Sequence, residues 1–282
     1  MIDMKKTTRR NSGAILVFVL VATATLTALA LLAGMYASDR ARIVSDTVTR
    51  SALRDEAFDA LALAASLIAS DTNGVDHLSE EWAQPMRFGR VEVFIADETS
   101  RLNFTSAPPA AFASLLSEPK AADALTAWRD SQNTNRVWMA EEELLLAPHT
   151  PNLRDALPFL TAHGDSRVNV NTLPHEVFVA LAASRNIPAA TADEIFKRLE
   201  DARKRGEFFA ALTPAEAARI FSSSAKTPSP QELAALQTLL PSLRVESGLF
   251  RVTARASEGA VSQTIQIVYE RATSRILRWV EL

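Results

Sequence analysis

The chain has 282 residues, with 30 Lys+Arg against 33 Asp+Glu and a formal net charge of -3. This balance gives no electrostatic argument for a nucleic-acid partner, and a hydrophobic content of 48% excludes disorder along the whole length. Cysteine is absent, which excludes disulfides, thiolate metal sites and cysteine nucleophiles.

Residues 14–35 form an uncharged apolar stretch. As a helix this stretch is long enough to cross the roughly 30 Å hydrocarbon layer of a membrane. Lys5, Lys6, Arg9 and Arg10 precede it, so the positive-inside rule predicts a cytoplasmic N-terminus with most of the chain across the membrane. The stretch is longer than the 7–15 apolar residues typical of a secretory signal.

The junction before this stretch resembles the class III signal of type IV pilins and pseudopilins. A basic leader ends in Asn11-Ser12-Gly13, and the apolar run begins at Ala14. By this resemblance prepilin peptidase cuts after Gly13, and Ala14 becomes the mature N-terminus. Pilin-like chains usually carry glutamate at the fifth mature position, which here is Phe18. A carboxylate buried in hydrocarbon is costly without a partner charge, so an apolar residue there suits a tip subunit with no neighbour above it. A plain single-pass anchor is the alternative.

A long helix is predicted over residues 14–69. Gly34 is the only glycine between Gly13 and Gly74, and no proline occurs before Pro85. The distal part has one apolar face that can pack on a domain, and residues 70–74 supply a stop signal. That face consists of Leu53, Ala57, Leu61, Ala64 and Ile68.

Alternating residues predict strands at 90–96, 250–255, 261–269 and 276–280, whereas residues 106–240 are typical of helices. Capping-box patterns beginning at Thr191, Thr213 and Ser229 open three of these helices. The predicted fold class is α+β: a pilin-like long N-terminal helix packed on an antiparallel sheet, with an inserted all-helical domain.

The predicted division of the chain has five parts. They are a prepilin leader (1–13), a transmembrane or filament helix (14–37), the distal helix with the first part of the α/β domain (38–105), the inserted helical domain (106–240) and the C-terminal strands (241–282).

One local pattern occurs twice. Residues 102–108, followed by Phe112, are matched 66 positions later by residues 168–174, followed by Phe178. Both predict a short extended segment that turns into a helix, with Ser106 or Thr172 as the N-cap and a proline in the first turn. Two occurrences indicate a recurring local device and not a solenoid.

The order of features along nearly the whole chain resembles general secretion pathway protein K, the family of large minor pseudopilins of type II secretion. The motifs are the glycine-ended leader, residues 71–76 leading to Glu81-Trp82-Ala83, residues 97–103, residues 168–172 and the terminal hairpin. The resemblance implies a non-enzymatic subunit that caps a periplasmic pseudopilus and supports export of folded proteins across the outer membrane. The implied partners are the I-type and J-type minor pseudopilins, the major pseudopilin, prepilin peptidase, the inner membrane and a secreted substrate.

Two alternatives stay open. A minor pilin of a type IV pilus has the same features. A membrane-anchored helix-hairpin-helix DNA receptor is similar at residues 169–172, but residues 185–188 replace its glycine-rich loop. The basic residues nearby (Lys197, Arg198, Arg203, Lys204 and Arg205) alternate with acidic ones, with Glu194 to Arg198 and Glu200 to Lys204 at i, i+4 spacing. This is typical of a solvated helix face, and no nucleic-acid partner is predicted.

Catalytic chemistry has no motif to support it, because His77, His149, His163 and His175 show no metal-ligand spacing. Calcium is the one cofactor considered. Asp71, Asn73 and Asp76 offer hard oxygen ligands, but calcium needs six to eight. We favour a helix C-cap and turn for this loop, since Asp, Asn and Gly are common turn residues.

Overall fold

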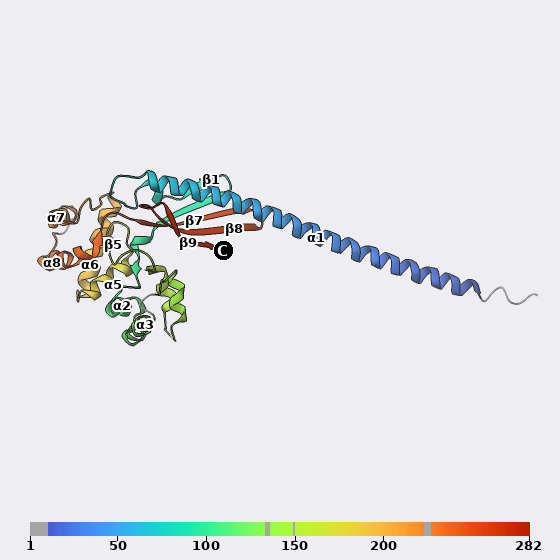
Figure 1. Cartoon of the computed structure of the whole chain (residues 1–282), viewed down its shortest axis with the longest axis horizontal. Coiled ribbons are helices and arrows are strands. Elements are labelled where there is room, and N and C mark those ends of the chain that lie inside the picture. The colour runs from blue at the N-terminus through green and yellow to red at the C-terminus, as the bar shows by residue number, and fades with distance from the viewer. Residues whose placement is uncertain (1–10, 133–135, 149, 223–226) are drawn as a thin grey trace, which may run out of the picture.

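The computed structural model describes residues 11–132, 136–148, 150–222 and 227–282. Its dominant feature is the helix α1 (Asn11–Ser70), whose N-terminal half extends away from the rest of the molecule as a shaft (Figure 1). At 1.5 Å per residue its 60 residues span about 90 Å. Gly74, at φ +73°, lies in the loop that follows its end. The predicted helix over 14–69 is therefore confirmed.

The head contains a five-stranded antiparallel sheet in the order β1-β2-β7-β8-β9. Its strands are β1 (Met86–Phe88), β2 (Val91–Asp97), β7 (Leu249–Glu258), β8 (Val261–Glu270) and β9 (Arg275–Glu281). Gly259, at φ +58°, lies in the two-residue loop between β7 and β8, where a tight hairpin turn favours glycine. The four predicted strands are confirmed. β1 was not predicted, because three residues after Pro85 are too few to show alternation.

The distal half of α1 packs on one face of this sheet (Figure 1). The predicted helix face from Leu53 to Ile68 is buried there, against Val93, Val252 and Ile267 among others. Trp82 closes one end of this core, with its ring 5.2 Å from that of Phe250. Burial of these side chains is what holds the shaft to the head.

A second hydrophobic core runs from Leu102 to Leu243 and belongs to the region between β2 and β7. Its α-helices are α2 (Pro109–Leu116), α3 (Pro119–Ser131), α4 (Leu153–Ala156), α5 (His175–Ser184), α6 (Ala189–Lys204), α7 (Pro214–Ser222) and α8 (Pro230–Leu239). The α+β, pilin-like fold class is thus confirmed, but the inserted region is mainly helical and not all-helical, because short strands also lie within it.

The helical region also contains two parallel strand pairs of two residues each. β3 (Leu102–Asn103) pairs with β4 (Leu160–Thr161), and β5 (Val168–Asn169) pairs with β6 (Leu243–Arg244). A 3-10 turn with the sequence Leu-Pro-x precedes both β4 and β6. The region therefore consists of two units, 102–161 and 168–244, that share one plan, and α2 of the first packs on α5 of the second.

The repeated pattern has a common structural basis. The side chains of Asn103 and Asn169 accept hydrogen bonds from the amides of Thr105 and Asn171, both at 2.9 Å, which forms the same turn twice. The predicted N-caps are wrong, however, because α2 and α5 begin after Pro108 and Pro174, with no side-chain cap.

An arginine completes each turn. Arg129 donates to the carbonyls of Phe104 and Ala107 at 2.9 and 2.6 Å. In the second unit Arg203 donates to the carbonyls of Val170 and Leu173 at 2.8 and 3.0 Å. These arginines are not 66 positions apart, so the sequence pattern does not reveal them.

Candidate functional site

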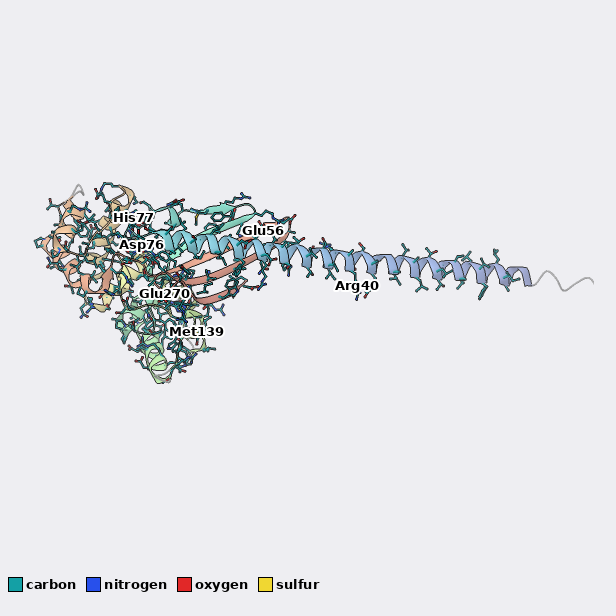
Figure 2. The ribbon with its side chains drawn as sticks, turned by 45° about the horizontal axis from the view of Figure 1, so that its top comes forward. Arg40, Glu56, Asp76, His77, Met139 and Glu270 are labelled. Atoms are coloured by element: carbon teal, nitrogen blue, oxygen red, sulfur yellow. The ribbon has the colours of Figure 1, made fainter. Side chains whose placement is uncertain are left out.

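The residues predicted for processing lie at the free end of α1. Gly13, Ala14 and Phe18 are exposed, Phe18 at 74%. The 18-residue window that qualifies α1 as a membrane span has a mean hydropathy of 2.7, and none of it is buried inside the chain. Figure 2 shows side chains projecting from the shaft, and the labelled Arg40 directly follows Asp39, the first charged residue beyond the apolar part. This apolar surface needs a lipid or protein environment.

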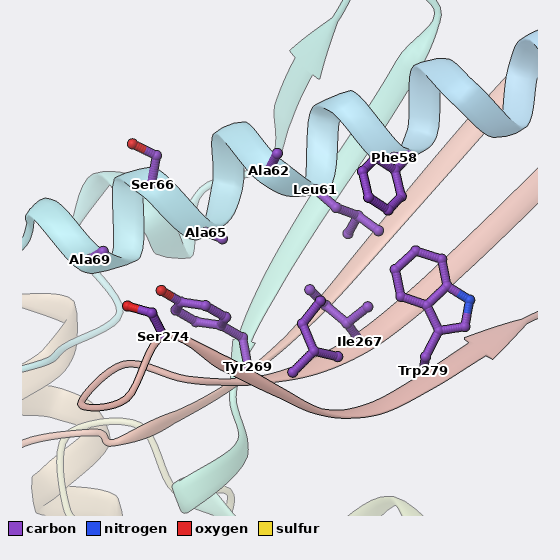
Figure 3. A pocket seen from close by; sticks show the side chains of 11 residues that line it. Phe58, Leu61, Ala62, Ala65, Ser66, Ala69, Ile267, Tyr269, Ser274 and Trp279 are labelled. Atoms are coloured by element: carbon purple, nitrogen blue, oxygen red, sulfur yellow. The ribbon is translucent and has the colours of Figure 1, made fainter.

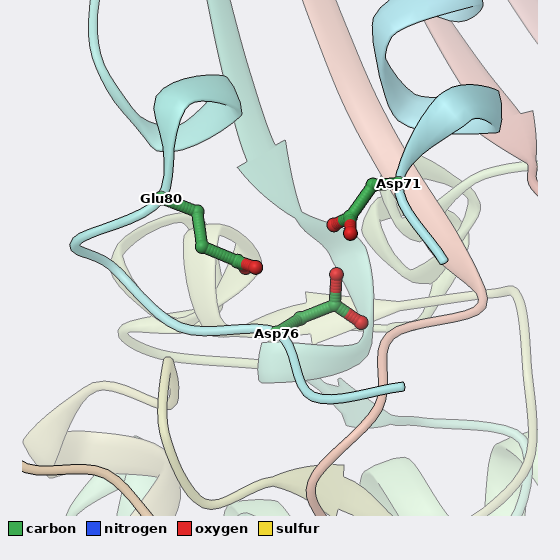
Figure 4. Close-up of side chains that lie close together, drawn as sticks. All are labelled: Asp71, Asp76 and Glu80. Carbon is green, nitrogen blue, oxygen red and sulfur yellow. The ribbon is translucent and has the colours of Figure 1, made fainter. Parts of the chain in front are cut away.

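The loop predicted as a turn or calcium site brings three carboxylates together. Asp71, Asp76 and Glu80 each place an oxygen within 4.8 Å of the others (Figure 4). The Asn73 side-chain amide donates to Glu80, and its Oδ1 accepts from the Val75 amide at 3.0 Å. The predicted Asp71 and Asp76 therefore meet, while Glu80, four residues beyond Asp76, was not predicted.

The side chain of Arg271 already supplies a positive charge to this cluster. The Arg271 guanidinium pairs with Asp76 and approaches Asp71 Oδ2 at 3.7 Å. The other Asp76 oxygen accepts from the Ser247 amide at 2.5 Å. Burial raises the pKa of Asp76 to about 6, even though these donors oppose the rise. The Glu80 Oε2 accepts from the Trp82 indole at 2.8 Å and the His77 amide at 2.9 Å. Asp71 Oδ2 accepts no hydrogen bond from the described residues, but the oxygens of Asp76 and Glu80 are committed to these donors, so the cluster fits a structural turn better than a calcium site.

Two polar junctions join the inserted region to the sheet. At the first, Arg251 of β7 donates to the fully buried Glu98 at 2.8 and 2.7 Å and pairs with Glu141 at 2.7 Å. Arg278 of β9 reaches the other Glu141 oxygen at 2.9 Å, and Thr161 donates to Glu98 at 2.7 Å. Burial lowers the pKa of Arg251, but its hydrogen bonds with Glu98 and the charges of both glutamates outweigh this and raise it.

The second junction centres on Asp97, at the end of β2. Its Oδ1 accepts from the amide and hydroxyl of Thr99 at 2.8 and 2.6 Å, and its Oδ2 accepts from the hydroxyls of Thr172 and Ser247. Burial raises the pKa of Asp97 despite these bonds. Asn169 donates to the Ser247 hydroxyl at 2.8 Å. Thr172 thus connects the two regions and does not cap a helix.

The basic residues of α6 do not form the predicted solvated face. Arg198 is 5% exposed and pairs with Glu232 of α8 at 3.3 Å, and not with Glu194. Arg203 turns inward, and burial lowers its pKa to about 10. Lys204 pairs with Asp201 at 4.0 Å, and not with Glu200. Lys197 and Arg205 are exposed together with Lys204, which leaves a smaller basic surface than the sequence suggests.

The histidines are dispersed over the head. His77 stacks on Phe208 with ring centres 4.0 Å apart, and His175 Nε2 lies 2.9 Å from Asp193. Burial lowers the pKa of His163. His149 lies outside the described residues. Within the described ranges, the one group of three or more potential metal ligands is the cluster of Asp71, Asp76 and Glu80.

The chain was compared with known proteins in three ways. No protein-family model matches it, and no curated protein matches it. Among solved structures, it is similar to a chain of the crystal structure of the GspK-GspI-GspJ complex from the type 2 secretion system of enterotoxigenic Escherichia coli. The TM-score is 0.54 at 16% identity, over 83% of this chain and 97% of that chain. The similarity shows that the two chains share a fold.

Proposed function

We propose that the chain is a K-type minor pseudopilin that caps the tip of a type II secretion pseudopilus and so supports export of folded proteins across the outer membrane. The observation that carries this proposal is the apolar N-terminal half of α1, which packs on no other residue that the structure describes and runs without a break into a pilin-type head. Such a surface suits lipid before assembly and neighbouring apolar helices afterwards.

The shape of the head supports the position at the tip. Beyond the sheet that packs on α1, the inserted region with its own core widens the head on one side of the shaft (Figure 1). A broad head obstructs a further subunit above it. Phe18 agrees with this position, since a terminal subunit has no neighbour above it whose ammonium could neutralise a glutamate.

The proposed partners are I-type and J-type minor pseudopilins, beside a major pseudopilin and prepilin peptidase. Support comes from the structurally similar chain, which belongs to a complex with two other such proteins. In this proposal the N-terminus is cytoplasmic, α1 crosses the inner membrane once, and the head is periplasmic.

A minor pilin of a type IV pilus is the nearest alternative, and the large inserted region favours the secretion version. A DNA receptor is less favoured, because Arg198 and Arg203 are turned inward and committed to Glu232 and to backbone carbonyls. Calcium forms no part of the proposed mechanism, since Arg271 already neutralises Asp76.

N-terminal sequencing of the membrane-inserted protein tests the processing step. In cells with prepilin peptidase the mature chain is expected to begin at Ala14, and in cells without it the leader is expected to remain. Gly13→Leu should block cleavage. The matched control is Gly34→Leu, which changes the other glycine of α1, also with open space around it, and should leave cleavage intact.

An intact Met1 in cells that contain the peptidase would contradict the proposal, and so would a start near Ser38. The first result leaves a plain anchor, and the second leaves a secreted domain.

A further inference from the structure

An apolar groove of about 380 Å³ opens between the distal half of α1 and the strands β8 and β9 (Figure 3). One wall is formed by α1, with Phe58, Ala62 and Ala65. The floor and the other wall come from the sheet, with Ile267, Ile276 and Trp279.

The groove exists because α1 does not cover the whole sheet. It packs against β2, β7 and β8, whereas β9 is the edge strand. Phe58 and Trp279 face each other across the mouth with ring centres 5.7 Å apart (Figure 3), yet they remain 55% and 36% exposed. Ile276 is 50% exposed. Large apolar side chains left exposed around a concave surface are typical of a protein contact.

The groove continues a nearly uncharged seam along α1 toward the membrane. Its residues follow alternating spacings of three and four, which is the 3.5-residue period of a helix that packs against a second helix in a left-handed pair. They are Ala41, Val44, Val48, Ser51, Asp55, Phe58, Ala62, Ala65 and Ala69. All are exposed except Ala65, which is half-buried. Over about 42 Å of helix, most of these side chains are small enough for a close helix approach.

Asp55 is the one charged residue of this seam. It is exposed, and it makes no ion pair with any residue that the structure describes. The adjacent Arg54 is committed to Glu281 through bonds of 2.7 to 3.0 Å. An unpaired carboxylate inside an otherwise uncharged seam is complementary to a lysine or arginine on the occupant, and a charge at such a position fixes partner and register.

We propose that this groove receives an amphipathic α-helix from a second membrane-anchored pilin-like subunit. The helix lies parallel to α1, places apolar side chains between α1 and β9, and brings a lysine or arginine to Asp55. The parallel direction follows because both helices start in the same membrane with their N-termini on the same side. This inference rests on the proposed function and specifies the surface used for one of its partners.

The absence of cysteine allows a direct test. Ala62→Cys and Ala65→Cys are introduced singly into the full chain, which is expressed in its host membrane with the companion subunits and treated with a short bismaleimide. The companions carry single cysteines along their own apolar helices. Leu63→Cys is the control, because Leu63 is 54% exposed but lies on another side of α1. Both groove positions should cross-link to a companion helix at least several-fold more than Leu63→Cys.

A charge reversal tests the role of Asp55. Asp55→Lys should lower the cross-linking of Ala62→Cys about tenfold, because a lysine then faces the partner's cation. Asp46→Lys makes the same change on the opposite side of the helix, nine residues away, and should leave the yield unchanged. Cleavage behind Gly13 and membrane insertion are followed in parallel for each variant.

Equal cross-linking at positions 62, 63 and 65 would refute the proposal that the groove receives a partner helix. A product made only of two copies of this chain would refute it as well. If the wild-type chain retrieves its companions while the cross-linking yields at positions 62, 63 and 65 are equal, the proposed function stands and only the role of the groove is refuted. If the wild-type chain retrieves no companion at all, both are refuted.

Discussion

Asp76 shows how one buried carboxylate can be held between opposing effects. It is completely buried, which favours its neutral form, while Arg271 and the Ser247 amide favour its charged form. Burial is the larger effect, so the pKa of Asp76 is raised to about 6. The residue was predicted as a turn or ligand residue, but only the folded chain brings Arg271 to it from 195 positions away.

The raised pKa of Asp76 predicts a pH dependence of stability. A carboxyl whose pKa is higher in the folded state than in the unfolded state binds its proton more tightly when folded. The contribution of Asp76 to the free energy of unfolding should therefore increase as the pH falls from 7 through 6 toward 4.5, by at most about 1.4 kcal/mol per pH unit. Asp76→Asn should lack this increase. Denaturant unfolding of both full-length chains in detergent measures it, and parallel curves would refute the assignment.

At the scale of elements, helix starts differ in how well local sequence specifies them. The box at Ser229 forms as predicted: its hydroxyl accepts from the Glu232 amide at 3.2 Å, and Glu232 accepts from the Ser229 amide. At Thr213 only one of the two hydrogen bonds of a capping box forms: the Thr213 hydroxyl accepts from the Glu216 amide at 3.1 Å. The Glu216 carboxylate accepts from the Ala210 amide and from Arg219 instead of the Thr213 amide. The prediction at Thr191 is wrong, since α6 begins at Ala189, after Pro188, and Thr191 lies inside the helix.

This difference predicts unequal costs for two similar substitutions. Ser229→Ala removes a formed N-cap and should lower the free energy of unfolding by about 1 kcal/mol. Thr191→Ala should have little effect or stabilise slightly, because alanine has the higher helix propensity inside a helix. Equal losses for the two variants in denaturant unfolding would contradict the cap assignment.

At the scale of the whole molecule, polar junctions tie the inserted region to the sheet beside two separate hydrophobic cores. Glu98 and Glu141 meet three arginines within one largely buried site, and these charges come from distant segments of the chain. The arginines are Arg251, Arg101 and Arg278. Removal of one member of such a group leaves an uncompensated buried charge, which costs far more than the loss of an exposed ion pair.

Arg251→Met should therefore lower the free energy of unfolding by about 3–5 kcal/mol, because it removes the guanidinium that pairs closely with both Glu98 and Glu141, while Arg101 stays 3.7 Å from each of them. Arg255→Met is the matched control on the same strand, where the side chain is exposed, and its change should stay within about 0.5 kcal/mol. A loss below 1 kcal/mol for Arg251→Met would show that the junction does not hold the two regions together.

The sequence alone determined the features that depend on neighbouring residues. The helix α1 follows from an apolar run without proline, its end follows from residues 70–74, and the strands β2, β7, β8 and β9 follow from alternation. The processing residues Gly13, Ala14 and Phe18 were likewise identified from neighbouring residues alone, and their role stays a prediction.

Only the tertiary structure decided which distant groups meet. Arg271 at Asp76, Arg251 at Glu98, Arg198 at Glu232 and the groove between α1 and β9 have no local signal, because side chains far apart in the sequence become neighbours only when the cores pack. Short parallel pairs such as β3 with β4 escape prediction for the same reason, since two residues carry no period. Periodicity is a property of consecutive residues, whereas electrostatic neutralisation and surface shape are properties of the packed chain.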